Sequence, residues 1–236
     1  MSPAPVDAAR LLALLSLPAP EAAPRLLGGV FGHRTPEGVV ALRITEIEAY
    51  GGPAGSDLPD PGAHTYRGRT PRNASMFGPP GHVYVYFTYG MHHAVNLVCR
   101  PAGEAGGCLI RAGEVVEGLG LARERRAAGR ATPVPDAALA RGPGNLAKAM
   151  GIGLVHDGAP LAPGEDAADP GFFLVLPEPA ARPALASGPR TGVSGPGGTD
   201  AFPWRWWIPG EPSVSPYRAA AARRRRRAGA EGGPIA

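Results

Sequence analysis

The feature that most constrains the fold of this 236-residue chain is the segment HVYVYFTYGMHHAVNLV at residues 82–98. Residues 82–88 are almost all aromatic or β-branched, a composition that favours a strand. Tyr89-Gly90 follows as a turn, and roughly residues 93–99 form a second strand. The segment therefore predicts a β-hairpin.

Strand alternation gathers polar and aromatic side chains on one face of this predicted sheet. Residues 39–50, VVALRITEIEAY, also predict a strand, and alternate positions of each strand share a face. A carboxylate, tyrosines and an amide could thus line one concave surface, although spacing does not separate the two glutamates. The residues expected on this face are Glu46, Glu48, Tyr50, Tyr84, Tyr86, Thr88 and Asn96.

The other predicted elements mix helices with strands. Apolar spacing and terminal charges predict the helices, and short apolar runs predict the strands. No regular strand–helix alternation is present, so the α+β class is favoured. The expected helices are residues 5–17, 113–127 and 143–151, and the further strands are residues 107–112, 172–176 and 204–208.

Length and composition are those of one globular domain, or at most two small ones, with long loops. The 35 glycines and 29 prolines cluster in segments such as residues 51–63 and 157–200. Cys99 and Cys108 are interpreted as buried small residues, because two cysteines without a CxxC motif build no disulfide framework. We expect a cytoplasmic protein, since the chain has neither a membrane-length apolar run nor a convincing signal peptide.

The net charge of +4 is unevenly distributed. Residues 218–236 contain six arginines, five of them consecutive at Arg223–Arg227, and one glutamate, so residues 1–217 carry a net charge of −1. Bulk charge therefore does not mark the folded part as a nucleic-acid binder. We expect a single domain at residues 1–217 and a disordered basic tail at residues 218–236 that can contact phosphates or another polyanion.

Four segments follow one another in the order ITEIEAYGGP, GAHTYRGRTPRNASMFGPPGHVYVYFTYGMHHAVNLV, GCLIRAGEVVEG and RGPGNLAKAMGI. Together they closely resemble the alkyladenine (3-methyladenine) DNA glycosylase family, over roughly residues 25–208. The E-A-Y triplet, TPRN followed by MF, and YVYFTYGM are specific in combination. The resemblance implies one α+β domain with a curved, mostly antiparallel β-sheet, flanking helices and a protruding β-hairpin.

The activity that the resemblance implies is base-excision repair. The family flips alkylated or deaminated purines (3-methyladenine, 7-methylguanine, hypoxanthine, ethenoadenine) out of duplex DNA and hydrolyses their bond to the sugar. Glu48 matches the catalytic carboxylate, which would activate water and favour an oxocarbenium-like transition state. Arg111 matches an arginine that would orient Glu48 and keep it ionised. The match thus selects Glu48 over Glu46.

Other positions match residues that hold the flipped base or the DNA. Tyr50 and Tyr86 would stack on the base, His64 would pack on it and hydrogen-bond its edge, and Asn96 would crowd the 2-amino group of guanine. Tyr89 at the hairpin tip would fill the gap that the nucleotide leaves. Arg67, Arg69 and Arg72 lie in a polar loop before the hairpin, and Arg72, in TPRN, is the best candidate for a phosphate contact.

The partner implied is double-stranded DNA containing damaged purines, bound by a monomer with no membrane attachment. No cofactor is needed for hydrolysis, and no metal is expected, because His64, His82, His92 and His93 lack a metal-binding spacing. The only lysine, Lys148, lies in the GNLAKAM segment. A monofunctional enzyme is predicted, since cutting the backbone usually requires an amine nucleophile.

Three other functions remain open from the sequence. A non-catalytic module that binds damaged DNA would keep the pocket and Tyr89 but would not need Glu48. A nucleic-acid-binding domain that reads RNA or assists another enzyme would not need both wedge and pocket. A hydrolase of free nucleosides would need neither the wedge nor Arg72, and salt should not affect it.

Overall fold

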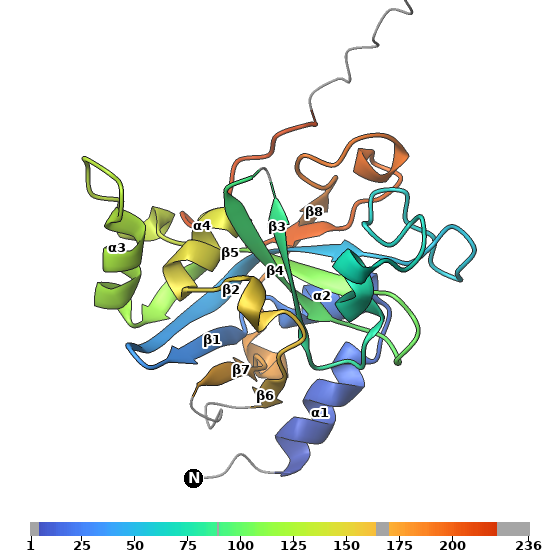
Figure 1. Ribbon diagram of the computed structural model, residues 1–236, viewed down its shortest axis with the longest axis horizontal. Helices are drawn as coiled ribbons and strands as arrows, with labels where there is room; N and C mark the ends of the chain where they lie inside the picture. The colour runs from blue at the N-terminus through green and yellow to red at the C-terminus, as the bar shows by residue number, and fades with distance from the viewer. Residues whose placement is uncertain (1–4, 89, 164–169, 221–236) are drawn as a thin grey trace, which may run out of the picture.

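The computed structural model describes residues 5–88, 90–163 and 170–220, which form one α+β domain (Figure 1). The helices are α1 (Pro5–Leu15), α2 (Ala19–Leu26), α3 (Leu119–Ala127) and α4 (Pro143–Met150). The strands are β1 (Val30–Thr35), β2 (Gly38–Tyr50), β3 (Val83–Thr88), β4 (His92–Val98), β5 (Gly107–Glu117), β6 (Leu161–Pro163), β7 (Gly171–Val175), β8 (Ala186–Gly188) and β9 (Arg205–Trp207).

All of these strands join one curled sheet, which confirms the predicted fold class. Its main path runs β3-β4-β5-β2-β1-β7-β6, and β9 pairs with both β2 and β8. The strand pairs are antiparallel except for β6 with β7. The predicted strands at residues 39–50, 82–88, 93–99, 172–176 and 204–208 therefore match β2, β3, β4, β7 and β9 within about one residue.

The two faces of the sheet differ in chemistry because side chains alternate along each strand. On one face, Val83 and Val85 belong to an apolar core that also takes side chains from α1, α2 and α4. On the other face, Tyr84 and Val98 pack with Met76 in a smaller cluster. We call this second side the polar face, because it also carries the charged side chains described below.

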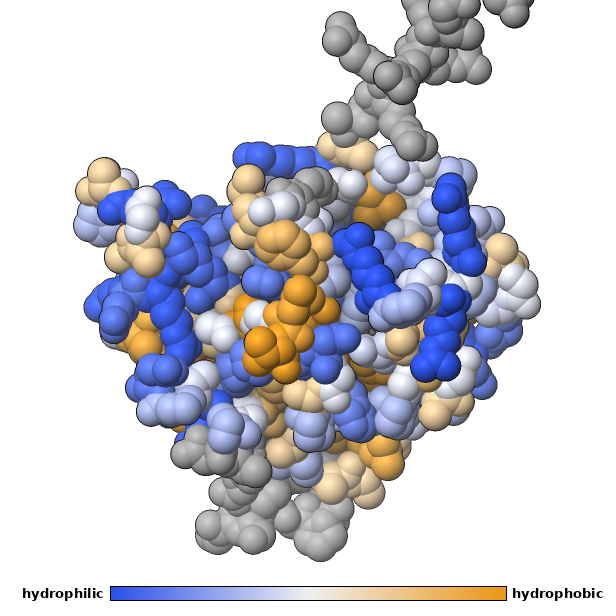
Figure 2. Space-filling model, viewed as in Figure 1, coloured by the Kyte–Doolittle hydropathy of each residue, from blue (hydrophilic) through white to orange (hydrophobic). Residues whose placement is uncertain are grey.

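The β3–β4 hairpin is confirmed, and its end projects from the sheet. The register pairs Val83 with Leu97 and Thr88 with His92. Burial falls toward the turn, where Phe87 is 40% and Met91 69% exposed. Figure 2 shows an apolar patch over this hairpin and the adjacent 3-10 helix η3 (Leu154–His156). Tyr89, in the turn, lies outside the described residues.

The helix predicted over residues 113–127 is wrong in its first half. Strand β5 continues to Glu117, and α3 begins only at Leu119. The long strand β2 supplies a pairing partner for the extension, with Arg43 opposite Glu114 and joined to it by a 2.8 Å ion pair. Strand pairing thus outweighs the local charge pattern that favoured a helix.

Helix α2 and strands β1, β6 and β8 are not predicted from the sequence. In β1, Gly32 interrupts the pattern for a packing reason, because a Cβ there would lie 2.0 Å from the ring of Phe173. Cys99 and Cys108 are buried and free, as predicted. Within the described ranges, no helix has the length and apolar character needed to cross a membrane.

Candidate active site

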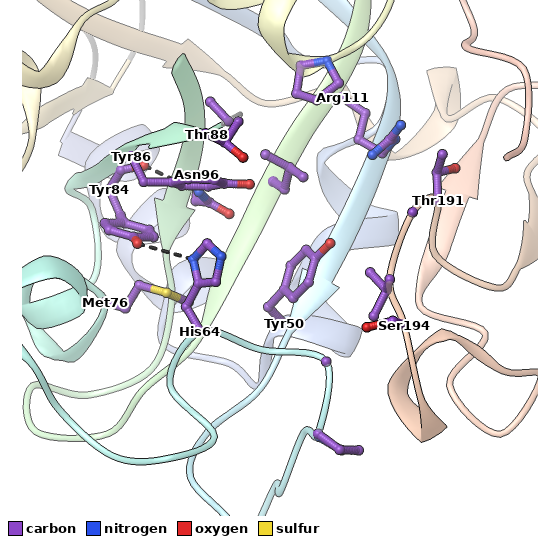
Figure 3. A pocket seen from close by; sticks show the side chains of 17 residues that line it. Tyr50, His64, Met76, Tyr84, Tyr86, Thr88, Asn96, Arg111, Thr191 and Ser194 are labelled. Atoms are coloured by element: carbon purple, nitrogen blue, oxygen red, sulfur yellow. Dashed lines mark hydrogen bonds between the residues drawn. The ribbon is translucent and has the colours of Figure 1, made fainter. Parts of the chain in front are cut away.

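A pocket of about 290 Å³ opens on the polar face of the sheet (Figure 3). Strands β2 to β5 supply its floor and one wall, because alternate side chains of these strands point to the same side. Two segments without regular structure, residues 61–64 and 191–194, close the remaining sides. Its lining includes Tyr50, His64, Met76, Tyr84, Tyr86, Thr88, Asn96, Arg111, Thr191 and Ser194.

One wall of the pocket is a cluster of three aromatic rings. Tyr84 and Tyr86 stack with their centroids 5.5 Å apart and their planes 24° from parallel. The ring of His64 meets Tyr86 edge to face at 4.6 Å, and its Nδ1 lies 3.3 Å from the Tyr84 hydroxyl. The predicted shared face of Tyr84 and Tyr86 is thereby confirmed, and the loop brings His64 to them.

The His64 ring is uncharged at neutral pH. Desolvation and then the positive charge of Arg72 lower the pKa of His64 below its usual value of 6.5. A neutral imidazole has one donor nitrogen and one acceptor nitrogen. His64 can therefore either donate a hydrogen bond to a ligand in the pocket or accept one from it.

Tyr50 stands across the pocket from this cluster. Figure 3 shows its ring between His64 and Asn96 on one side and Thr191 and Ser194 on the other. Behind the ring, the guanidinium carbon of Arg190 lies 4.6 Å from the ring centroid. The pocket is therefore a slot between aromatic side chains, a shape that accepts a planar ligand.

Glu48 lies directly behind the lining of this slot. Its side chain has no exposed surface, and three donors reach its carboxylate. The Tyr50 hydroxyl and Arg111 Nη1 lie 2.8 and 3.2 Å from Oε2, and the Thr191 amide lies 2.6 Å from Oε1. All three donors belong to residues that line the pocket. A carboxylate can accept about four hydrogen bonds, so these three contacts leave one acceptor position of Glu48 unused.

The second glutamate of this strand has a different environment. Glu46 accepts bonds from Arg111 Nε at 2.8 Å, from Arg205 Nε at 2.7 Å and from the Ser215 amide at 2.8 Å. Burial alone would raise its pKa, but these partners hold the pKa of Glu46 below its usual value. The β2–β5 register shifts on both sides of Glu46. Because Glu46 bonds Arg111 through Nε and Glu48 bonds it through Nη1, Glu46 anchors the guanidinium without competing for the nitrogen that reaches Glu48.

Arg111 joins the two carboxylates. Its side chain is 8% exposed, and it reaches Glu46 through Nε and Glu48 through Nη1. Burial alone would lower the pKa of Arg111, but Glu48 and Glu46 raise it above the ordinary value. Its charge is therefore permanent.

Asn96 lines the floor of the pocket from β4. It is 3% exposed, lies opposite Tyr84 in the strand register, and its Nδ2 donates to the Tyr84 carbonyl oxygen over 3.3 Å. This bond fixes the orientation of the amide beside the aromatic cluster. A ligand that enters the slot therefore meets a rigid polar group at its inner end.

The predicted DNA-contact arginines lie outside the pocket. Arg72 belongs to the 3-10 helix η1 (Pro71–Phe77), and its Nη2 donates to the Phe87 carbonyl oxygen over 2.8 Å. Arg67 and Arg69 are exposed in the loop before η1. The structure thus places Arg72 against the hairpin end.

Sequence reasoning missed the wall formed by residues 190–194, in a Gly/Pro-rich connection without a recognisable motif. Arg190 is fully buried and forms a bidentate ion pair with Asp60, with both distances 2.6 Å. Asp60 also accepts bonds from the amides of Gly51 and Gly62. The pair thereby joins the two loops that close the pocket. The only available signal was the two opposite charges themselves, far apart in the sequence.

Among residues 5–88, 90–163 and 170–220, no three His, Cys, Asp or Glu side chains gather as metal ligands. Lys148 is exposed on α4, where its Nζ donates to the Ala128 carbonyl oxygen over 2.8 Å. It does not belong to the residues that line the pocket. The titratable groups at the slot are therefore a carboxylate, a guanidinium, an imidazole and phenols.

Comparison with known proteins relates this geometry to one family. The family model described as "Methylpurine-DNA glycosylase (MPG)" matches residues 13–212. A protein of Leifsonia xyli named "Putative 3-methyladenine DNA glycosylase" is 57% identical over 198 residues, which cover 84% of this chain and 87% of that protein. A protein with the same name from Streptomyces avermitilis is 51% identical and covers 89% of this chain and 92% of its own length.

Proposed function

The chain belongs to the methylpurine-DNA glycosylase family, and we propose that it removes damaged purines from duplex DNA in base-excision repair. The proposed substrates are 3-methyladenine, 7-methylguanine, hypoxanthine and ethenoadenine. The observation that carries this proposal is the aromatic slot that Arg111 lines, with Glu48 directly behind the lining and paired to Arg111. A planar base fits such a slot, and the charged pair supplies a hydrolytic group beside it.

Stacking offsets the cost of flipping the base out of the duplex. Extruding a nucleotide costs a few kcal/mol, and the cost is smallest for a damaged or mispaired base. Each aromatic stack contributes about 1–3 kcal/mol per base. Tyr50 on one side and Tyr86 with His64 on the other thus favour a flipped damaged base. The amide of Asn96 would crowd the 2-amino group of guanine and disfavour normal guanine.

Glu48 acts as general base toward the water that attacks the sugar C1′. As the glycosidic bond breaks, the water oxygen bonds to C1′, its proton passes to Glu48, and the purine leaves with the bonding electrons. The negative charge of Glu48 also stabilises the oxocarbenium-like sugar. Arg111, anchored by Glu46, keeps the carboxylate oriented and ionised.

Binding to DNA involves the surface around the hairpin. Tyr89 fills the space left by the flipped nucleotide, as an inserted wedge does in other proteins that distort DNA. Arg72, with Arg69 and Arg67, contacts phosphates, so binding weakens as salt rises. Without a lysine at the pocket, hydrolysis by water leaves an intact abasic strand, and the enzyme is monofunctional.

The proposal is tested with duplexes that each contain one of the four lesions, under single-turnover conditions. Released base is measured by chromatography, and strand breaks are measured before and after alkali. We expect base release from at least one lesion, breaks only after alkali, and no release from the free nucleosides. Lesion binding without base release on all four duplexes would favour the non-catalytic binding module instead. Release from nucleosides that salt does not affect would favour a nucleoside hydrolase.

A further inference from the structure

The side chain of Tyr50 belongs to two environments at once. Its ring forms one side of the slot, whereas its hydroxyl lies 2.8 Å from Glu48 Oε2. Tyr50 and Glu48 are two residues apart on β2, so both side chains leave the same face of the strand. The long tyrosine side chain therefore reaches along the strand to the carboxylate while its ring still faces the pocket.

The tyrosine ring is held from behind. Arg190 lies 4.6 Å from its centroid, and Arg190 in turn is fixed by the ion pair with Asp60 and by bonds to the carbonyl oxygens of Ala49 and Gly197. The guanidinium is fully buried and cannot swing away into solvent. Tyr50 thus presents its hydroxyl to Glu48 in a fixed orientation rather than as one of several rotamers.

The hydroxyl donates in this hydrogen bond. Burial, and then the negative charge of Glu48, raise the pKa of Tyr50 well above 10. The phenol therefore keeps its proton over the whole working range of pH. A protonated phenol beside a carboxylate donates to it, and a donor favours the ionised form of that carboxylate.

We propose that the Tyr50 hydroxyl is a positioning group for Glu48, which holds the carboxylate ionised and aimed while the ring of the same residue stacks on the base. This inference rests on the proposed function, because it concerns the reaction that Glu48 performs. It gives the tyrosine a role that a phenylalanine cannot replace, although a phenylalanine would stack equally well.

Other groups around Glu48 remain in place when the hydroxyl is removed. Arg111 on β5 and the Thr191 amide bond the carboxylate directly, and Arg190 adds a nearby positive charge. On the far side of Arg111 lie Glu46 and Arg205. Tyr86, across the slot, faces Tyr50. Removing one of three donors should therefore weaken the ionised form of the carboxylate without abolishing it.

The test compares Tyr50→Phe with Tyr86→Phe, because both variants keep the ring and lose one hydroxyl at the same slot. Single-turnover base release is measured from pH 5 to pH 9 on a duplex that the wild type cleaves. We expect the acid limb of the Tyr50→Phe profile to lie about one pH unit higher than that of the wild type, a tenfold loss of rate on that limb. With each profile scaled to its own plateau rate, the midpoint of the acid limb of Tyr86→Phe should match that of the wild type, whatever the absolute rate of this variant. Lesion binding by Tyr50→Phe should change less than threefold.

A second variant guards against a simple loss of folding. Site-specific 3,5-difluorotyrosine at position 50 keeps the ring and strengthens the hydroxyl as a donor, so the acid limb should move to lower pH. Acid limbs that coincide for wild type, Tyr50→Phe and difluorotyrosine would overturn the positioning role. Equal shifts in Tyr50→Phe and Tyr86→Phe would overturn it as well. A wild type that releases no base from any lesion would instead refute the proposed function.

Discussion

Substituting either residue of the buried ion pair between Asp60 and Arg190, which joins the two loops around the pocket, should strongly destabilise the fold. The carboxylate has no exposed surface and accepts four bonds, two from Arg190 and one each from the amides of Gly51 and Gly62. Substitution Asp60→Asn keeps the size and one acceptor of the side chain. It leaves the guanidinium of Arg190 buried without its ion-pair partner.

The expected cost follows from that isolated charge. Removing one partner of a buried ion pair typically destabilises a protein by about 3–5 kcal/mol. For a chain of this length each kcal/mol lowers the melting temperature by about 2–4 °C. We therefore expect Asp60→Asn to melt on the order of 10 °C below the wild type.

The assay is urea and thermal unfolding followed by circular dichroism, and the chain offers a matched control. Arg123 and Asp136 also form a bidentate pair, with distances of 2.8 and 2.7 Å, but both side chains are about half exposed. Exposed pairs contribute little, so Asp136→Asn should leave the unfolding midpoint almost unchanged. If Asp60→Asn were as stable as Asp136→Asn, the reasoning about the buried charge would be refuted.

Two further predictions concern pH and salt. Burial lowers the pKa of His33 to about 4. Between pH 6.5 and pH 4 only the unfolded chain therefore binds a proton at this residue, and the free energy of unfolding decreases as pH falls through this window. In His33→Gln this decrease should be smaller, by at most about 3 kcal/mol. The Gly192 amide beside the pocket donates to the Arg218 carbonyl oxygen, so the residue at which the predicted basic tail begins lies beside the pocket. Deleting residues 221–236, which include Arg223–Arg227, should lower the slope of log K for duplex binding against log salt concentration by up to about 4.5. Deleting residues 228–236 should leave that slope unchanged. Equal slopes for the full chain and the chain without residues 221–236 would contradict a contact between the tail and DNA.

Much of the slot follows from local sequence rules. Alternation along two strands placed Tyr84 with Tyr86 and Glu48 with Tyr50. In the structure Tyr50, Tyr84 and Tyr86 line one pocket, and Glu48 lies behind its lining, bonded to the Tyr50 hydroxyl. The resemblance added His64, which no periodicity could have placed because it lies in an irregular loop. The functional roles of these residues stay predictions until variants are measured.

The rest depends on contacts between segments far apart in sequence. Asp60 and Arg190 meet across 130 positions, and neither has a local pattern that selects the other. Strand β5 extends through Glu114 because β2 lies beside it, a circumstance that the local charge pattern does not reveal. Spacing also left Glu46 and Glu48 equivalent. The family resemblance selected Glu48, and the structure shows that the two carboxylates have different partners. Local rules thus predict faces of strands, whereas tertiary partners decide the chemistry of each group.

The most direct test of the account is single-turnover base release by Glu48→Gln on a duplex with one hypoxanthine, with ethenoadenine as a second lesion. The substitution keeps the shape and removes the charge, and Glu114→Gln on the exposed part of β5 serves as control. We predict that Glu48→Gln binds the lesion but releases base at least about 100-fold more slowly than the wild type, whereas Glu114→Gln keeps the wild-type rate. Release by Glu48→Gln within threefold of the wild-type rate would contradict the central claim that this carboxylate drives the reaction.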